Sequence, residues 1–253
     1  MAIIIFLLGA IIGSFLNVCI YRIPKDESII FPGSHCANCS TPLKWYDLIP
    51  VLSFLFLRGK CRYCGDKISL QYPVIELLSG IIFLIFYYRL GLNIDFSYYT
   101  FLFSIFIIIV LIDCRHQIIP NSLVLLILIG TFIYRLIEFF IYDKHLSLFN
   151  YLYGLLISVI LFLLIFIISK GGIGGGDIKL IGVLGFILGF PEIILNIFLS
   201  FLIGAIISVF LLAFRIKNKK DPIPFGPFII LGFVVTFFWG EIIIDWYMLT
   251  MLR

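Results

Sequence analysis

Charged residues are scarce in this 253-residue chain. Asp, Glu, Lys and Arg make up 13% of it, whereas hydrophobic residues make up 62% and the mean hydropathy is +1.20. This composition excludes an ordinary globular protein, so lipid must surround most of the chain. The net charge of +4 is too small to indicate a nucleic-acid partner. The sequence also lacks an internal repeat and a nucleotide-binding signature.

Eight apolar runs predict eight membrane helices in an all-α protein. Several runs approach the roughly 20 residues that a helix needs to cross a bilayer, and they recur along the whole chain, which a cleaved signal peptide cannot explain. A single helix over 177–214 would be far too long, so we expect a break at Gly189, Phe190 and Pro191. The predicted helices cover residues 2–21, 73–90, 97–113, 122–141, 149–169, 177–190, 192–214 and 226–249.

One extended polar stretch follows the first predicted helix and is rich in Pro, Cys, Lys and Arg. We interpret residues 22–72 as a small folded insert between the first two membrane helices. The sequence thus predicts three parts, namely a first transmembrane helix (1–21), the insert (22–72) and a seven-helix membrane region (73–253).

The positions of the cations predict the orientation of the chain. Most of the 18 Lys and Arg residues fall in the insert and in the loops that share its side of the membrane. Because cytoplasmic loops carry the excess of Lys and Arg, we expect the insert in the cytoplasm and both termini outside. The protein is then a multi-pass protein of a bacterial inner membrane, and its insert lies in a reducing compartment.

Two acidic residues adjoin the predicted membrane helices at the same side. Asp113 ends the helix over 97–113 and Asp177 begins the helix over 177–190. Asp177 alone could be a helix cap, but a carboxylate at a helix C-terminus opposes the helix dipole, so Asp113 needs another explanation. Two neighbouring carboxylates do not readily ionise together, and such a pair supplies a general base and a general acid for peptide hydrolysis.

A glycine-rich stretch over 171–177 precedes the second of these acids. Glycine permits irregular backbone and close approach, so an extended substrate strand could reach Asp177 here.

Four of the six cysteines form two CxxC pairs, and Cys19 and Cys114 stand alone. This spacing favours a zinc ribbon or knuckle, in which four thiolates surround a tetrahedral ion. Four protein ligands leave no open position, so we expect the zinc to be structural. The alternative is a pair of reduced or disulfide-linked turns. The predicted ligands are Cys36, Cys39, Cys61 and Cys64.

Several segments resemble those of type IV prepilin peptidases, and the similarity spans nearly the whole chain. GGGDIKL at 174–180 and LIDCRHQIIPNSL at 111–123 look like the two aspartate motifs of that family. Further resemblance is carried by GSFLNVCIYRIP (13–24), WYDLIPVLSFLFLRGKCRYCGDKIS (45–69), YPVIE (72–76) and PFGPFI (224–229).

The resemblance implies a GxGD-type intramembrane aspartyl endopeptidase with Asp113 and Asp177 as its catalytic residues. Its partners would be membrane lipids and a type IV prepilin or pseudopilin, whose basic leader it removes after a glycine at the cytoplasmic face. Many family members also methylate the new N-terminus with S-adenosylmethionine, and Glu76 and the insert are the candidate region for that activity. Some members lack the cysteines, which implies that the metal is dispensable for cleavage.

Three other functions remain open at this point. In a secondary transporter the acids would bind a proton or cation, although both lie at helix ends and not at the midplane. A non-catalytic zinc-ribbon scaffold would not need the acids. An intramembrane protease of broader specificity, in the manner of presenilin, would not explain the cysteine insert.

Overall fold

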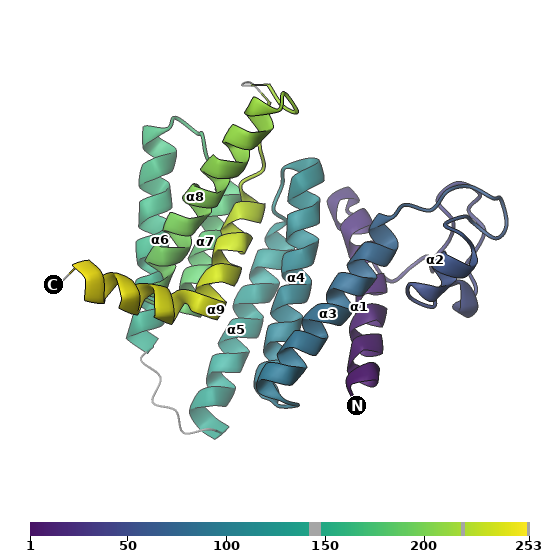
Figure 1. Cartoon of the computed structure of the whole chain (residues 1–253), viewed down its shortest axis with the longest axis horizontal. Helices are drawn as coiled ribbons and strands as arrows, with labels where there is room; N and C mark the ends of the chain where they lie inside the picture. The colour runs from purple at the N-terminus through teal and green to yellow at the C-terminus, as the bar shows by residue number, and fades with distance from the viewer. Residues whose placement is uncertain (142–147, 219–220, 252–253) are drawn as a thin grey trace. The chain divides into compact units, whose positions relative to one another are not determined.

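The computed structural model describes residues 1–141, 148–218 and 221–251, and its elements over these ranges are helices, with two isolated β-bridges (Figure 1). The α-helices are α1 (Ala2–Arg22), α2 (Leu52–Phe56), α3 (Gln71–Leu90), α4 (Ile94–His116), α5 (Asn121–Ile141), α6 (Leu148–Ile168), α7 (Gly175–Leu188), α8 (Glu192–Ala213) and α9 (Gly226–Met251). Two compact units, Met1–Leu111 and Ile112–Arg253, divide the chain within α4.

The described ranges confirm the eight predicted apolar helices, with boundaries that shift by a few residues. Seven of the described helices are long and apolar enough to cross a membrane. The eighth, α7, has 14 residues and is therefore about 21 Å long. The predicted break before α8 is confirmed: Gly189 ends α7 with φ +80°, and Pro191 is the N-cap of α8.

The predicted end of the third membrane helix at Asp113 is wrong. α4 continues to His116, so Asp113 lies within the last helical turn. The helix continues because the Gln117 N–H donates to the Asp113 carbonyl at 2.9 Å. It stops at Gln117 itself, which has φ +54°. Asp113 thus belongs to the second unit, as Asp177 does.

Small residues bring α1 and α3 into backbone contact in the first unit. A Cβ atom on Gly9 would lie 2.9 Å from the Gly80 Cα, and a Cβ on Gly13 would lie 2.7 Å from the Glu76 Cα. Gly9 and Gly13 are four residues apart and share one face of α1, the spacing that lets membrane helices approach closely. This contact sets the position of the insert, which leaves α1 and returns at α3.

The short helix α7 is central in the second unit and contacts α5, α6, α8 and α9. Glycine lets α6 and α7 touch: a Cβ on Gly185 would lie 2.4 Å from the Gly154 carbonyl oxygen. At the end of α7 away from Asp177, the half-buried Arg135 donates to the Ile187 carbonyl at 2.9 Å and pairs with Glu138 at 2.6 Å. Packing along its whole length therefore holds the helix that carries Asp177.

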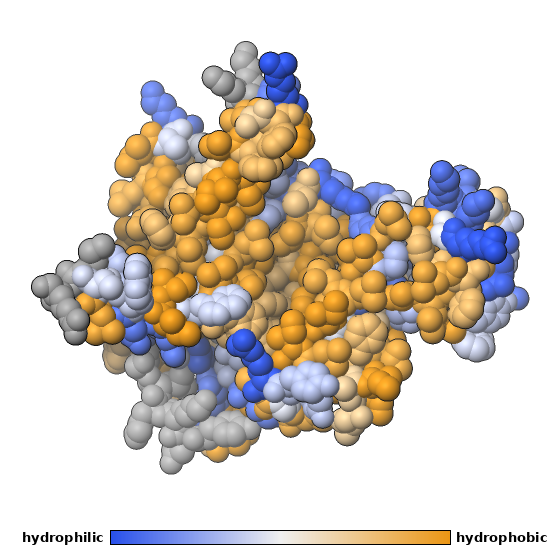
Figure 2. Space-filling view, in the orientation of Figure 1, coloured by the Kyte–Doolittle hydropathy of each residue, from blue (hydrophilic) through white to orange (hydrophobic). Residues whose placement is uncertain are grey.

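Apolar side chains cover most of the visible helix surface, as expected for helices in lipid, whereas hydrophilic residues gather on the insert (Figure 2). The exposed large side chains of α6, for example, are those of Leu, Ile, Phe and Tyr residues. The molecule therefore presents to its surroundings the surface of a multi-pass membrane protein.

Candidate active site and metal centre

Asp113 is buried, with 4% of its surface exposed, and its carboxylate has a specific hydrogen-bond donor. The backbone N–H of Gly226 donates to Asp113 Oδ2 at 3.0 Å. Gly226 is the first residue of α9, so the positive end of that helix dipole faces the carboxylate. This donor offsets the unfavourable position of Asp113 in the last turn of its own helix.

Asp177 is also buried, with 8% exposed, and lies in the first turn of α7. Its Oδ2 accepts a hydrogen bond from the Gly174 N–H at 3.1 Å. The expected capping contact is therefore present. Each of the two acids has one carboxylate oxygen held by a glycine N–H at the start of a helix.

The side chain of Ile119 lies next to the backbone segments that hold both acids. Its Cβ lies 3.0 Å from where a Cβ on Gly176 would be, and its Cδ1 lies 3.2 Å from the equivalent point on Gly226. Gly176 precedes Asp177 and Gly226 holds Asp113, so the segments that carry the acids meet around one side chain.

Two neighbouring buried carboxyl groups favour a state with one proton between them, because two nearby negative charges are costly in a poorly solvated site. Such a pair can accept a proton at one group and donate one at the other. The structure therefore brings together the two residues that the sequence selected.

The four predicted metal ligands also come together, and their sulfur atoms all lie within 4.8 Å of one another. The Sγ atoms of Cys36 and Cys64 are 3.8 Å apart. Tetrahedral zinc with Zn–S bonds of about 2.3 Å separates two sulfurs by about 3.8 Å, so the cluster is compatible with a structural zinc.

Two similar turns build this cluster. The Cys36 N–H donates to the Thr41 carbonyl at 3.0 Å, and the Cys61 N–H donates to the Asp66 carbonyl at 2.7 Å. Each turn has a positive φ four residues after its first cysteine, at Ser40 (+54°) and Gly65 (+77°). The two CxxC pairs therefore form matching knuckles, as the spacing predicted.

The buried carboxylate of Asp47, which sequence reasoning missed, secures the second knuckle. Its side chain is 3% exposed and accepts hydrogen bonds from Arg62 Nε at 2.7 Å and Tyr63 Oη at 3.0 Å. Arg62 and Tyr63 stand between Cys61 and Cys64 in the chain. The available signal was the acid in the WYD triplet (45–47), but its partners become visible only when the insert folds.

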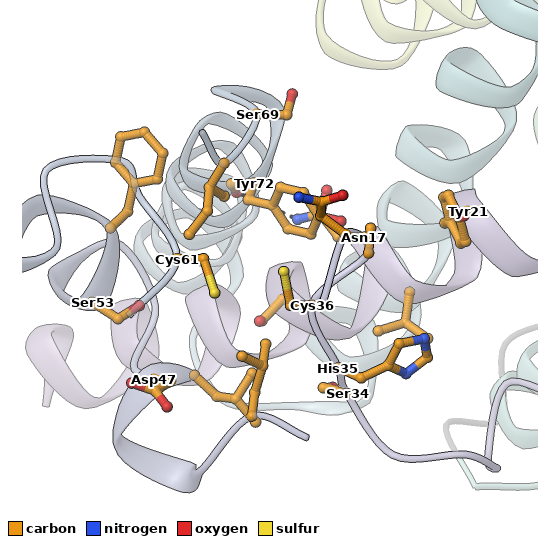
Figure 3. Close-up of a pocket in the computed structure, with 18 of the residues that line it drawn as sticks. Asn17, Tyr21, Ser34, His35, Cys36, Asp47, Ser53, Cys61, Ser69 and Tyr72 are labelled. Atoms are coloured by element: carbon orange, nitrogen blue, oxygen red, sulfur yellow. Dashed lines mark hydrogen bonds between the residues drawn. The ribbon is translucent and has the colours of Figure 1, made fainter. Parts of the chain in front are cut away.

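Glu76 lies in the first unit, in α3, and is 7% exposed. Its Oε2 accepts a hydrogen bond from the Val51 N–H at 2.7 Å, which ties α3 to the insert. Glu76 also lines a cavity of about 510 Å³ between the insert and the facing ends of α1 and α3. Cys36 and Cys61 are directed into this cavity, and Asn17, Tyr21 and Tyr72 line it as well (Figure 3).

The fold and the two sites define a class: a multi-pass membrane protein with a pair of buried carboxyl groups and a tetracysteine insert. Family models agree with this class. Residues 7–90 match the bacterial peptidase A24 N-terminal domain, and residues 100–209 match the type IV leader peptidase family. The chain belongs to the type IV leader peptidase family.

Curated relatives extend the match over nearly the full length. A prepilin leader peptidase/N-methyltransferase of Bacillus subtilis is 36% identical over 96% of this chain and 96% of its own. The protein of the same name from Xanthomonas campestris is 31% identical over 95% of this chain and 92% of its own. The Legionella pneumophila protein of that name is 31% identical over 98% and 94%. The comparison with solved structures gave no match.

Proposed function

We propose that this protein is an aspartyl endopeptidase that removes the leader of type IV prepilins or pseudopilins, with Asp113 and Asp177 as its catalytic residues. The observation that carries the proposal is the pair of buried carboxyl groups, held by segments that meet around Ile119, in a member of the type IV leader peptidase family. The relatives' names indicate prepilins as the substrate class.

The proposed reaction needs no nucleophilic side chain. The ionised member of the pair takes a proton from water, and the resulting hydroxide attacks the carbonyl carbon of the scissile peptide bond. The protonated member donates its proton to the departing amine nitrogen, so the C–N bond breaks and one proton remains on the pair. The hydrogen bonds from Gly226 and Gly174 keep Oδ2 of each acid in place, which leaves Oδ1 of each for these transfers.

The positions of the cations support an insert in the cytoplasm, because cytoplasmic segments carry the excess of Lys and Arg. Asp113 and Asp177 would then act at the cytoplasmic face of the inner membrane. Zinc, held by Cys36, Cys39, Cys61 and Cys64, would supply structural cross-linking to the insert. With four thiolate ligands it has no place in the cleavage reaction.

The experiment that tests the proposal is mass spectrometry of a prepilin co-expressed with this protein or with an empty vector. We expect the prepilin to lose its leader after a glycine only when this protein is present. An intact prepilin N-terminus in membranes that contain the protein would refute the peptidase assignment.

The cavity beside Glu76 favours a second activity, the methylation of the new N-terminus. Its volume of about 510 Å³ is within the range of small-molecule sites, and carboxylates and tyrosine rings line it. S-adenosylmethionine is a cation at its sulfonium and would supply the methyl group. A negative charge on Glu76 would attract such a cation.

The Glu76→Gln variant distinguishes a role of the Glu76 charge in methylation from a role of its hydrogen bond in anchoring the insert. The amide oxygen can still accept the Val51 N–H, so the contact that ties α3 to the insert survives, while the negative charge is lost. We expect the prepilin to be cleaved normally and its new N-terminus to lack the methyl group, measured as a mass lower by one CH₂ group. Full methylation by Glu76→Gln would exclude the charge role and leave Glu76 as an anchor.

A further inference from the structure

Asp113 has a partner that lies far from both aspartate motifs in the chain. The N–H of Gly226 donates to Asp113 Oδ2 at 3.0 Å, and the contact is buried. Gly226 lies beyond the residues 100–209 that match the family model. We propose that Gly226 is a positioning residue of the peptidase site, which holds the Asp113 carboxylate through its N–H and tolerates no side chain. This inference rests on the proposed peptidase function.

The need for glycine follows from the approach of the carboxylate and not from the backbone conformation. A Cβ on Gly226 would lie 2.7 Å from Asp113 Oδ2 and 3.3 Å from its Cγ. Gly226 has no positive φ and begins a helix, so the backbone by itself would accept alanine. A methyl group at this position can fit only if the carboxylate moves away, and the hydrogen bond is then lost.

The surrounding chain fixes the position of this N–H. Pro227, the next residue, favours the start of a helix at this point. Upstream, the Pro222 carbonyl accepts hydrogen bonds from Lys217 Nζ at 2.7 Å and from Gln117 Nε2 at 3.3 Å. Gln117 directly follows α4, so the segment that leads to Gly226 is tied to the end of the helix that carries Asp113.

Gly226→Ala in the purified full-length protein tests the proposal with a prepilin as substrate. A displacement of about 1 Å in a catalytic group can lower a rate about 100-fold, so we expect kcat to fall about 100-fold while KM stays within about twofold. Gly240→Ala is the matched control. It lies in the same helix, where the nearest atom is the Thr236 Cγ2 at 3.2 Å, a methyl group that can give way, and we expect unchanged kinetics.

A second variant distinguishes the carboxylate contact from general crowding. The same Cβ would lie 3.2 Å from Ile119 Cδ1, and Ile119→Val removes that atom. The double variant Gly226→Ala/Ile119→Val therefore has more room but retains the conflict with Asp113, and we expect its kcat to stay low. If the single variant accumulates poorly in the membrane, the double variant can be assayed in its place.

Three outcomes would overturn the proposal: an unchanged kcat in Gly226→Ala, a rise in KM alone, or full recovery of kcat in the double variant. The last would assign the defect to packing against Ile119. Wild-type protein assayed on the same prepilin separates this inference from the function on which it rests. If the wild type does not cleave, the peptidase proposal fails, whereas equal cleavage by wild type and Gly226→Ala removes only the role of Gly226.

Discussion

Asp113→Asn and Asp177→Asn should each abolish removal of the prepilin leader. Asparagine has nearly the shape of aspartate and can still accept the Gly226 or Gly174 N–H, but it can neither take up nor deliver the proton. Because general acid–base catalysis contributes about 10²- to 10⁴-fold, and each variant removes either the base or the acid of the pair, we expect the cleavage rate to fall by about 10³-fold or more. The measurement is the ratio of mature to full-length pilin over time at matched enzyme levels in membranes.

Asp245→Asn provides the control for these variants. Asp245 is an exposed acid in α9, and its substitution should leave cleavage unchanged. Both Asn variants of the pair should reach the membrane in wild-type amounts, because their replacement leaves no charge in the buried site. Normal processing by either variant would rule out the dyad, and an ion flux that depends on Asp113 would instead support a transporter.

Loss of the two thiolates of the second CxxC pair should release zinc and unfold the insert. We expect the wild-type protein to contain one zinc ion per chain and a Cys61→Ser/Cys64→Ser variant to contain none, because two thiolates cannot complete a tetrahedral site. Structural zinc contributes on the order of 10–16 kcal/mol of apparent binding free energy in small peptides, far more than the sparse core of the insert supplies. Metal analysis and limited proteolysis between residues 26 and 70 measure the two effects.

The same variant tests whether the metal is needed for cleavage. We expect leader removal to continue, since the aspartates lie in the second unit and the insert belongs to the first. Cys19→Ala is the control: Cys19 is buried in α1, outside the cluster, and its loss should leave the zinc content unchanged. Wild-type protein without zinc, or with a disulfide between the CxxC pairs, would contradict the structural-zinc proposal.

Much of the fold could be predicted because lipid imposes a simple rule. A spanning segment must satisfy its backbone hydrogen bonds within a helix and must be apolar. Its position can therefore be predicted from one stretch of consecutive residues. The eight helices and the break at Gly189 followed from this rule. The end of α4 did not, because Cys114, Arg115 and His116 are polar enough to suggest a loop, yet hydrogen bonding continues the helix to His116.

The residues of the candidate site likewise include some that the sequence predicts and some that only the fold reveals. Motif spacing selected Asp113, Asp177 and the four cysteines, because the chemistry of these side chains and their distances along the chain are visible without a fold. Gly226 was visible only as part of the segment PFGPFI (224–229), without a role. No local pattern could connect it with Asp113, more than one hundred positions earlier in the chain.

By itself, the sequence determined the membrane class, the helices, the candidate catalytic acids and the metal ligands, since each depends on composition or on short-range spacing. Only the tertiary structure decided which backbone groups hold these acids, that Ile119 adjoins both Gly176 and Gly226, and that Asp47 secures the second knuckle. These contacts join residues from different helices and turns. Their geometry arises from the close packing of whole elements, which no local stretch of sequence contains.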